Sequence, residues 1–192
     1  MLIQNSYSSS AADTDAYAND VTAASGVAFT LAATAPGDSV AHKVIITPSG
    51  SVTGNYTISG IGFNGAAVSE TLATNTTNAV TSVNYYLSGL VVTAPAGLGA
   101  ETVDIGFTAA AITPPVWTRR EQRSGAFAMG ISVDATGTPA YSLQLTYGGE
   151  WYAHASIATK TASADGSILF PVQAVRLIFT AASVVKLNVV LS

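Results

Sequence analysis

The chain has 192 residues, a formal net charge of −4, no cysteine and only 9% charged residues, where an ordinary soluble domain carries about 25%. The acidic balance argues against a nucleic-acid-binding protein, because such proteins need a basic surface to neutralise phosphates. The lack of cysteine excludes disulfides and thiolate metal sites.

Ala, Ser, Thr, Gly and Val dominate the sequence, and this mixture favours pleated sheets with hydroxyl-bearing outer faces over surface helices with charged stripes. We therefore predict an all-β fold. A largely uncharged exterior is also easily desolvated, so we expect a homo-oligomer or assembly with companion chains.

Residues 1–26 are predicted to form an N-terminal arm, extended or a frayed helix, because their side chains are small, polar and acidic with little periodicity. Asp13, Asp15 and Asp20 lie in DTDAYAND. Tyr17 at the fifth position and the missing glycine and glutamate argue against a calcium loop. The opening MLIQNSYSSS has neither the basic nor the apolar region of a secretory signal.

Residues 27–112 contain short β-branched and aromatic runs separated by Gly, Pro and Asn, such as VAHKVIITP, GNYTISGI and VNYYLSGLVVTA. This pattern predicts a first antiparallel β-sandwich, or jelly-roll-like, module. The apolar stretch YYLSGLVVTAPAGLGA is broken by Gly and Pro and is too short for a membrane-spanning helix, so no membrane partner is expected.

Gly60, Gly62 and Gly65 have the G-x-G-x-x-G spacing of a dinucleotide-binding loop. That loop needs a helix behind it and an acidic residue about 20 positions on. Here AAVSETLATNTTNAV indicates a strand and a turn, and Tyr85 occupies the acidic position. We therefore predict a β-hairpin with a type I′ turn at Asn64-Gly65, both residues having positive φ, and a bulge or a tight bend at Gly60 and Gly62.

Residues 113–124 are predicted to form a linker, because Pro114 and Pro115 cannot donate to a ladder. The β pattern resumes in residues 125–192, which we expect to form a second β-sandwich module. The predicted architecture is two small antiparallel modules joined by a Pro-containing linker, and a single larger sandwich is the alternative.

Few residues suit catalysis. A Ser-His-Asp arrangement needs a histidine that a carboxylate orients, and both His42 and His154 lie in predicted strands, where we expect structural roles. A pair of carboxylates for glycoside hydrolysis depends on the fold. The acidic residues of the strands are interpreted more simply as turn and strand-edge residues: Glu70, Glu101, Asp104 and Glu150. We predict no catalytic residue, no metal ion and no cofactor.

Two clusters are candidates for binding. Trp117 precedes three of the seven basic residues, and this positive spot could dock on an acidic neighbour, with a solvated loop as the alternative; its arginines are Arg119, Arg120 and Arg123. Tyr147, Trp151 and Tyr152 could stack on sugars, although core packing explains them as well.

Two long stretches resemble virion structural proteins of tailed bacteriophages. NYTISGIGFNGAAVSETLATNTTNAVTSVNYYLSGLVVTAPAGLGAETVDIGF is similar to a head- and tail-protein pattern of strand, Asn-Gly or Asp-Gly hairpin, Glu-bearing strand, Thr/Ser turn, aromatic strand and closing V-x-I-G. FAMGISVDATGTPAYSLQLTYGGEWYAHASIA with PVQAVRLIFTAASVVKLNVVLS is similar to a second phage β-module. It departs from that pattern at Gly148-Gly149, where aspartates are common, and at Gln173, where a basic residue is common.

The resemblance implies a non-enzymatic structural protein of the virion, made in the host cytoplasm, whose partners are the major capsid protein or other virion proteins. Within that class, the expectation is a head decoration, or cement, protein that bridges shell subunits. A neck, collar or tail protein is the alternative, and a carbohydrate-binding β module is the alternative from another class.

Overall fold

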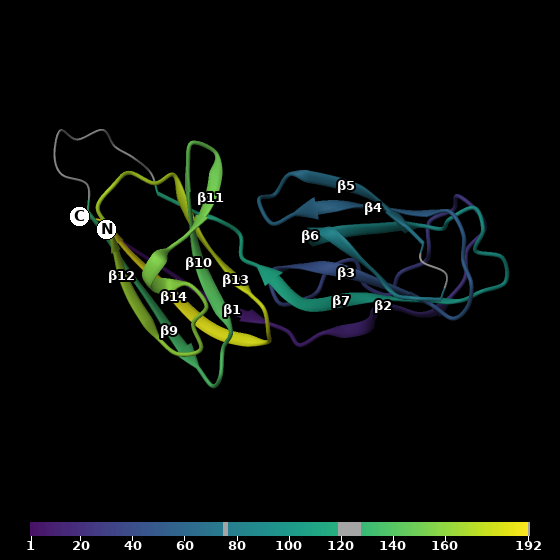
Figure 1. Ribbon diagram of the computed structural model, residues 1–192, viewed down its shortest axis with the longest axis horizontal. Coiled ribbons are helices and arrows are strands. Elements are labelled where there is room, and N and C mark those ends of the chain that lie inside the picture. The colour runs from purple at the N-terminus through teal and green to yellow at the C-terminus, as the bar shows by residue number, and fades with distance from the viewer. Residues whose placement is uncertain (75–76, 119–127, 192) are drawn as a thin grey trace.

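The computed structural model describes residues 1–74, 77–118 and 128–191 and shows two lobes built from β-strands (Figure 1). The strand pairs within and between the lobes are antiparallel. The prediction of an all-β fold with antiparallel, sandwich-like sheets is confirmed. Within the described residues no helix is long and apolar enough to cross a bilayer.

The first lobe comprises residues 13–112. Its strands are β2 (Asp13–Val21), β3 (Ala41–Pro48), β4 (Asn55–Gly62), β5 (Ala67–Ala73), β6 (Val80–Thr93) and β7 (Val103–Ile112). They lie in the order β7-β3-β6-β4-β5, and β2 also pairs with β7. Their inward side chains form one core whose fully buried members include Ile46, Tyr56, Ile58 and Ile105.

The second lobe comprises the N-terminal strand and the C-terminal part of the chain. Its elements are β1 (Leu2–Ser9), β8 (Val116–Trp117), β9 (Met129–Thr136), β10 (Tyr141–Tyr147), β11 (Glu150–Ala153), the 3₁₀ helix η1 (Ala155–Ile157), β12 (Ala164–Ile168), β13 (Ala174–Phe179) and β14 (Ser183–Leu191). One sheet has the order β1-β14-β9-β12, and β11-β10-β13 belongs to the other. A second core fills this lobe, with Leu143, Leu177, Phe179, Leu187 and Val189 among its buried side chains.

The N-terminal segment is not an arm, so this prediction for residues 1–26 is wrong. Strand β1 pairs with β14 along its whole length, and Ile3 and Tyr7 pack against the core of the second lobe. Strand β2 then places Tyr17 and Ala18 in the core of the first lobe. The sequence pattern did not indicate these strands, because each turns only a few apolar side chains inward and carries small polar residues at its outward positions.

The two lobes share one sheet. On one edge β7 pairs with β3, and on the other edge it pairs first with β2 and then, at Ala111 and Ile112, with Phe179 and Ile178 of β13. The result is a ten-stranded sheet that runs through both lobes. Two hydrophobic cores are therefore joined by continuous backbone hydrogen bonding.

The described part of the predicted linker is paired to the second lobe, so the prediction of a linker is wrong there. Thr113 is fully buried, its N–H donates to the Leu177 carbonyl (3.0 Å), and its Oγ1 accepts from the Leu177 N–H (3.0 Å). Strand β8 follows at once and pairs with β13. The two prolines stand between these pairings, where no ladder donor is needed. Residues 119–124 lie outside the described residues.

The glycine-rich segment is a hairpin, as predicted. Ile61 pairs with Ala67, and the ladder between β4 and β6 shifts register around Gly60 and Gly62, which confirms the bulge. The turn differs from the expected type I′, because among its residues only Gly65 has positive φ (79°), and its N–H donates to the Gly62 carbonyl (3.0 Å). The loop is one residue longer than a type I′ turn, and such loops need only their last residue in the left-handed region.

Candidate functional site

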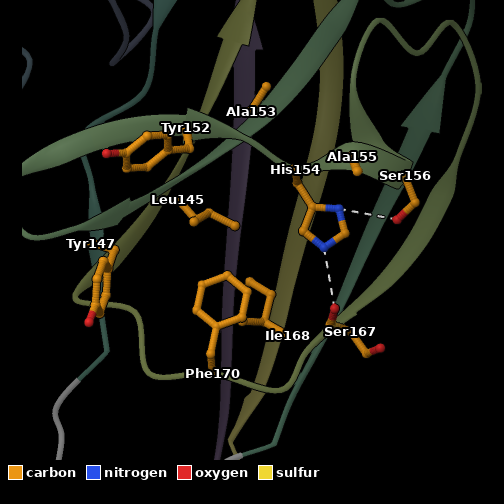
Figure 2. Close-up of a pocket in the computed structure, with 10 residues that line it drawn as sticks. All are labelled: Leu145, Tyr147, Tyr152, Ala153, His154, Ala155, Ser156, Ser167, Ile168 and Phe170. Carbon is orange, nitrogen blue, oxygen red and sulfur yellow. Dashed lines mark hydrogen bonds between the residues drawn. The ribbon is translucent and has the colours of Figure 1, made fainter.

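A cavity of about 480 Å³ opens beneath the β10–β11 hairpin in the second lobe (Figure 2). Its lining comes from three segments: the hairpin, the stretch from the hairpin into η1, and the end of β12 with the loop behind it. The residues are Leu145, Tyr147, Tyr152, Ala153, His154, Ala155, Ser156, Ser167, Ile168 and Phe170. We call it the aromatic pocket.

The turn of the hairpin places two tyrosines on the same face. Gly148 and Gly149 both have positive φ (63° and 88°), which is the conformation of a two-residue type I′ turn. Tyr152 lies opposite Leu145, and Tyr147 is two residues beyond Leu145 on the same strand. Tyr147 and Tyr152 are therefore diagonal neighbours on the pocket side of the hairpin.

Three aromatic rings at the pocket are open to solvent. The exposed fractions are 60% for Tyr147, 52% for Tyr152 and 49% for Phe170. Figure 2 shows Phe170 beside Ile168 in the middle of the pocket, with the tyrosines to one side. None of the ten lining residues is Asp, Glu, Lys or Arg. As far as the described residues define it, the site is thus concave and aromatic, and its lining is uncharged.

His154 forms the far wall of the pocket (Figure 2). Its Nε2 lies 3.3 Å from the Ser167 carbonyl and its Nδ1 lies 3.1 Å from the Ser156 hydroxyl. Because a carbonyl only accepts, Nε2 donates, and Nδ1 of the neutral ring accepts from Ser156. Both ring nitrogens are therefore used in tying η1 to β12. The orienting partner is a main-chain carbonyl, where a Ser-His-Asp triad has a carboxylate.

Trp151 is separated from the two tyrosines with which it clusters in sequence. It pairs with Thr146 and points to the opposite face of the sheet. There the Arg176 guanidinium lies 4.0 Å from the Trp151 ring centroid and 4.5 Å from that of Phe63, in the β4–β5 loop of the first lobe. Gln144 Oε1 accepts from Arg176 Nε (3.0 Å) and Nη2 (2.7 Å).

This arginine clamp, made of Arg176, Phe63, Trp151 and Gln144, joins the two lobes. Arg176 is only 7% exposed. Burial lowers its pKa to about 10, while its interaction with Tyr85 opposes that shift. The guanidinium therefore stays charged near neutral pH, and the aromatic faces stabilise the buried cation.

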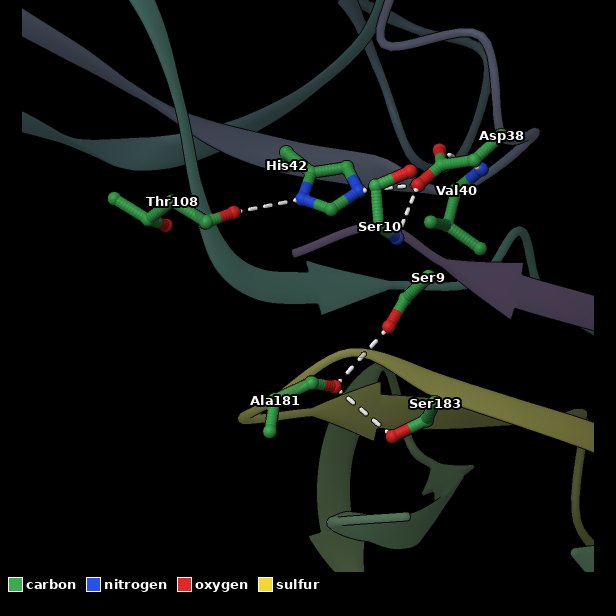
Figure 3. Close-up of polar contacts among 8 residues, drawn as sticks. All are labelled: Ser9, Ser10, Asp38, Val40, His42, Thr108, Ala181 and Ser183. Carbon is green, nitrogen blue, oxygen red and sulfur yellow. Dashed lines mark hydrogen bonds and ion pairs between the residues drawn. The ribbon is translucent and has the colours of Figure 1, made fainter. Parts of the chain in front are cut away.

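A second polar link lies where the chain first crosses between the lobes (Figure 3). Asp38 Oδ2 accepts from His42 Nε2 (2.8 Å) and from the Ser10 N–H (2.7 Å), and Oδ1 accepts from the Val40 N–H (3.3 Å). His42 Nδ1 lies 2.8 Å from the Thr108 carbonyl. Both nitrogens of this fully buried ring thus face acceptor oxygens.

The pKa of Asp38 reflects two opposing effects. Burial raises it, but hydrogen bonds from His42 and Ser10 outweigh burial and hold the pKa below its usual value. Close by, Ser9 donates to the Ala181 carbonyl (3.2 Å). The crossing segment is therefore fixed on both sides, with Ser10 held by the first lobe and Ser9 by the second.

The remaining sequence-predicted residues are dispersed. Trp117 is 60% exposed on β8, opposite Ala174, whereas Arg119, Arg120 and Arg123 lie outside the described residues. Within the described ranges no group of three or more His, Cys, Asp or Glu side chains could hold a metal ion.

The four carboxylates lie apart, and three of them accept hydrogen bonds from nearby groups. Glu70 accepts from the N–H groups of Val83 (2.8 Å) and Asn84 (3.1 Å). Glu101 accepts from the Ser49 hydroxyl (3.1 Å), and Asp104 accepts from the Asp20 N–H (2.8 Å). Glu150 is exposed at the hairpin turn.

Sequence reasoning missed Phe170 and the arginine clamp. Phe170 lies in the run ILFP, where Leu169 and Phe170 before a proline indicate apolar residues outside a regular strand. The clamp depends on a contact between β13 and a loop more than a hundred residues earlier. No local pattern indicates such a contact.

The fold and the site together define a two-lobed, all-β protein with a neutral aromatic pocket. No protein-family model matches the chain, and no curated protein does. A solved structure of allantoicase is similar to 78% of this chain and 72% of its own, with 10% sequence identity and a TM-score of 0.26. Similarity at that level carries no conclusion about fold or function.

Proposed function

We propose that this protein is a non-enzymatic structural protein of a tailed-bacteriophage particle. In the proposed role it decorates the head and bridges neighbouring shell subunits, with the major capsid protein as its partner. The sequence resemblance motivates the class. The observation that carries the role is the outer face of the β1–β14 strand pair, which we call the neutral face.

The neutral face has eight outward positions and one charge. They are Leu2, Gln4, Ser6 and Ser8 on β1 and Val184, Lys186, Asn188 and Val190 on β14. Leu2, Val184 and Val190 are 60%, 54% and 48% exposed. Charged residues are depleted at the centre of protein interfaces because their desolvation is costly. A face of this kind is suited to burial against another protein.

The links between the lobes support the same role. The continuous sheet, the arginine clamp and the Asp38 hydrogen bonds fix one lobe on the other. A rigid body loses little conformational entropy when it docks. With the N-terminal segment folded into the lobes, bridging falls to surfaces such as the neutral face and Trp117. Many weak contacts of this type hold a shell together through avidity.

The test is a binding assay with assembled capsids of the phage that encodes this chain. Purified protein is mixed with capsids that lack it, and co-sedimentation and electron microscopy measure the bound copies. Val184→Lys with Val190→Lys places two charges on the neutral face and should weaken binding at least tenfold. Val83→Lys is the matched control, because Val83 is 74% exposed on β6 of the other lobe.

Copy number separates the positions within the particle. Many copies distributed over the head support decoration, whereas a single ring at one vertex points to a neck, collar or tail protein. Absence of the chain from purified particles, together with a monomeric protein that ignores capsids, would contradict the proposal. Turnover of a small molecule at Ser156 and His154 would contradict its non-enzymatic part.

A further inference from the structure

We infer that the aromatic pocket is a binding site for a neutral saccharide. This inference goes beyond the assembly role and does not depend on it. It also differs from the sugar site suggested by sequence, because Trp151 is held by Arg176 on the opposite face of the hairpin. The rings available for stacking are Tyr147, Tyr152 and Phe170.

The shape of the pocket suits a small hydroxylated ring. Its volume of about 480 Å³ lies within the range of about 300–1,000 Å³ usual for small-molecule sites. A pyranose has an apolar face of C–H groups and a rim of hydroxyls. Half-exposed aromatic rings offer flat apolar surface to such a face, while the tyrosine hydroxyls stay in water and can hydrogen-bond to the rim.

The polar groups of the pocket match a neutral ligand. The side chains of Tyr147 and Tyr152 provide hydroxyls that can both donate and accept, and the Ser156 hydroxyl, which donates to His154, can still accept. Among the described residues the lining has no charged side chain to compensate a carboxylate, sulfate or phosphate on the ligand. A sugar acid or a phosphorylated ligand would have to lose hydration without a charged partner.

The pocket is largely preformed, which favours binding of a rigid ligand. The Gly148-Gly149 turn sets the backbone positions of the two tyrosines, and the hydrogen bonds of His154 fix the wall opposite them. Gly166 lets the His154 ring approach, because a Cβ there would lie 2.8 Å from Cε1. A site whose backbone is already in place loses less conformational entropy when a ligand binds.

The experiment begins with an array of neutral and acidic glycans, probed with the full chain. The neutral oligosaccharides bound on the array are then titrated by calorimetry against the wild type and three variants. Tyr152→Ala and Phe170→Ala each remove one exposed ring and should weaken binding at least tenfold. Leu169→Ala is the matched control, because Leu169 is 76% exposed beside Phe170 and does not line the pocket.

A second measurement locates the ligand without relying on loss of affinity. Leu145 and Ile168 line the pocket, and their methyl groups should shift in methyl NMR spectra on titration with the bound oligosaccharide. Circular dichroism of each variant confirms that its fold is retained.

Four results would overturn the inference. They are an array without neutral-glycan binding, preference for acidic glycans, affinity that Tyr152→Ala and Phe170→Ala leave unchanged, and binding of an extended peptide to the free edge of β11 in place of any sugar. Failure of capsid binding would leave the saccharide result untouched, so the two proposals fail separately.

Discussion

The arginine clamp allows a quantitative test of how the lobes are joined. Phe63→Leu keeps an apolar side chain in the β4–β5 loop but removes the aromatic face 4.5 Å from the Arg176 guanidinium. A cation–π contact contributes about 0.5–1 kcal/mol when exposed and about 2 kcal/mol when desolvated. Arg176 is 7% exposed, so we expect a coupling of about 1–2 kcal/mol between the two residues.

A double-mutant cycle isolates this coupling from the cost of each substitution. Equilibrium urea unfolding is measured for the wild type, Phe63→Leu, Arg176→Met and the double variant, with tryptophan fluorescence and far-UV circular dichroism as independent probes. Because each single variant already removes the contact, the double variant should be more stable than additivity predicts by about 1–2 kcal/mol. Coincident transitions from the two probes would show that the lobes unfold together.

The control cycle pairs Phe63→Leu with Lys186→Met on the neutral face. No contact joins these residues within the described part of the chain, and distant sites add to within about 0.5 kcal/mol. A coupling between Phe63 and Arg176 no larger than this control would refute the clamp. The same outcome would leave the continuous sheet as the link between the lobes.

Three further predictions follow from the same structure. Asp38→Asn should lower the free energy of unfolding by about 2 kcal/mol at pH 7. The folded-state pKa of Asp38 is depressed, so the ionised carboxylate stabilises the fold above the ordinary aspartate pKa near 3.8, and this stabilisation is lost as pH falls through the lower folded-state pKa. The free energy of unfolding, measured from pH 6 to pH 2, should therefore fall less in Asp38→Asn than in the wild type. Burial raises the pKa of Tyr56 to about 12 and also raises that of Tyr86, where Glu70 adds to the effect. The contribution of these two neutral phenols to the free energy of unfolding is complete below pH 10 and declines as pH rises through their folded-state pKa values. Unfolding and tyrosinate absorbance should therefore increase together above pH 10. Deleting residues 1–9 should unfold the second lobe, seen as lost proteolytic resistance, whereas an arm would be removed without effect.

The sequence predicted the features that depend on residues close together in the chain. Charge depletion and β-branched runs predicted the fold class. The alternation of Val175, Leu177 and Phe179 with Arg176 and Ile178 correctly separated the inward from the outward face of β13. The same alternation separates Trp151 from Tyr152, a signal that was available but was not applied to the aromatic cluster.

What the sequence did not predict depends on contacts between distant segments. The pattern of SYSSSAADTDAYAND does not predict that β1 pairs with the last strand of the chain. Arg176 lies on an outward face by its own pattern, yet Phe63 from the first lobe covers it. Pro114 and Pro115 indicated a break, and they do interrupt the ladder, but the buried Thr113 beside them anchors the crossing to Leu177.

Because the N-terminal segment is folded into strands β1 and β2 and is not a flexible arm, the proposed bridging would depend on rigid surfaces. A flexible arm gains contacts at the cost of ordering each residue, about 1–2 kcal/mol of backbone entropy apiece. Two lobes fixed by a shared sheet incur no such cost, so even a small face with three exposed apolar side chains can contribute usefully to binding. Stabilisation of a shell would then increase with the number of docked copies and with the rigidity of each one. Variants that loosen the clamp should therefore weaken capsid binding without altering the neutral face itself.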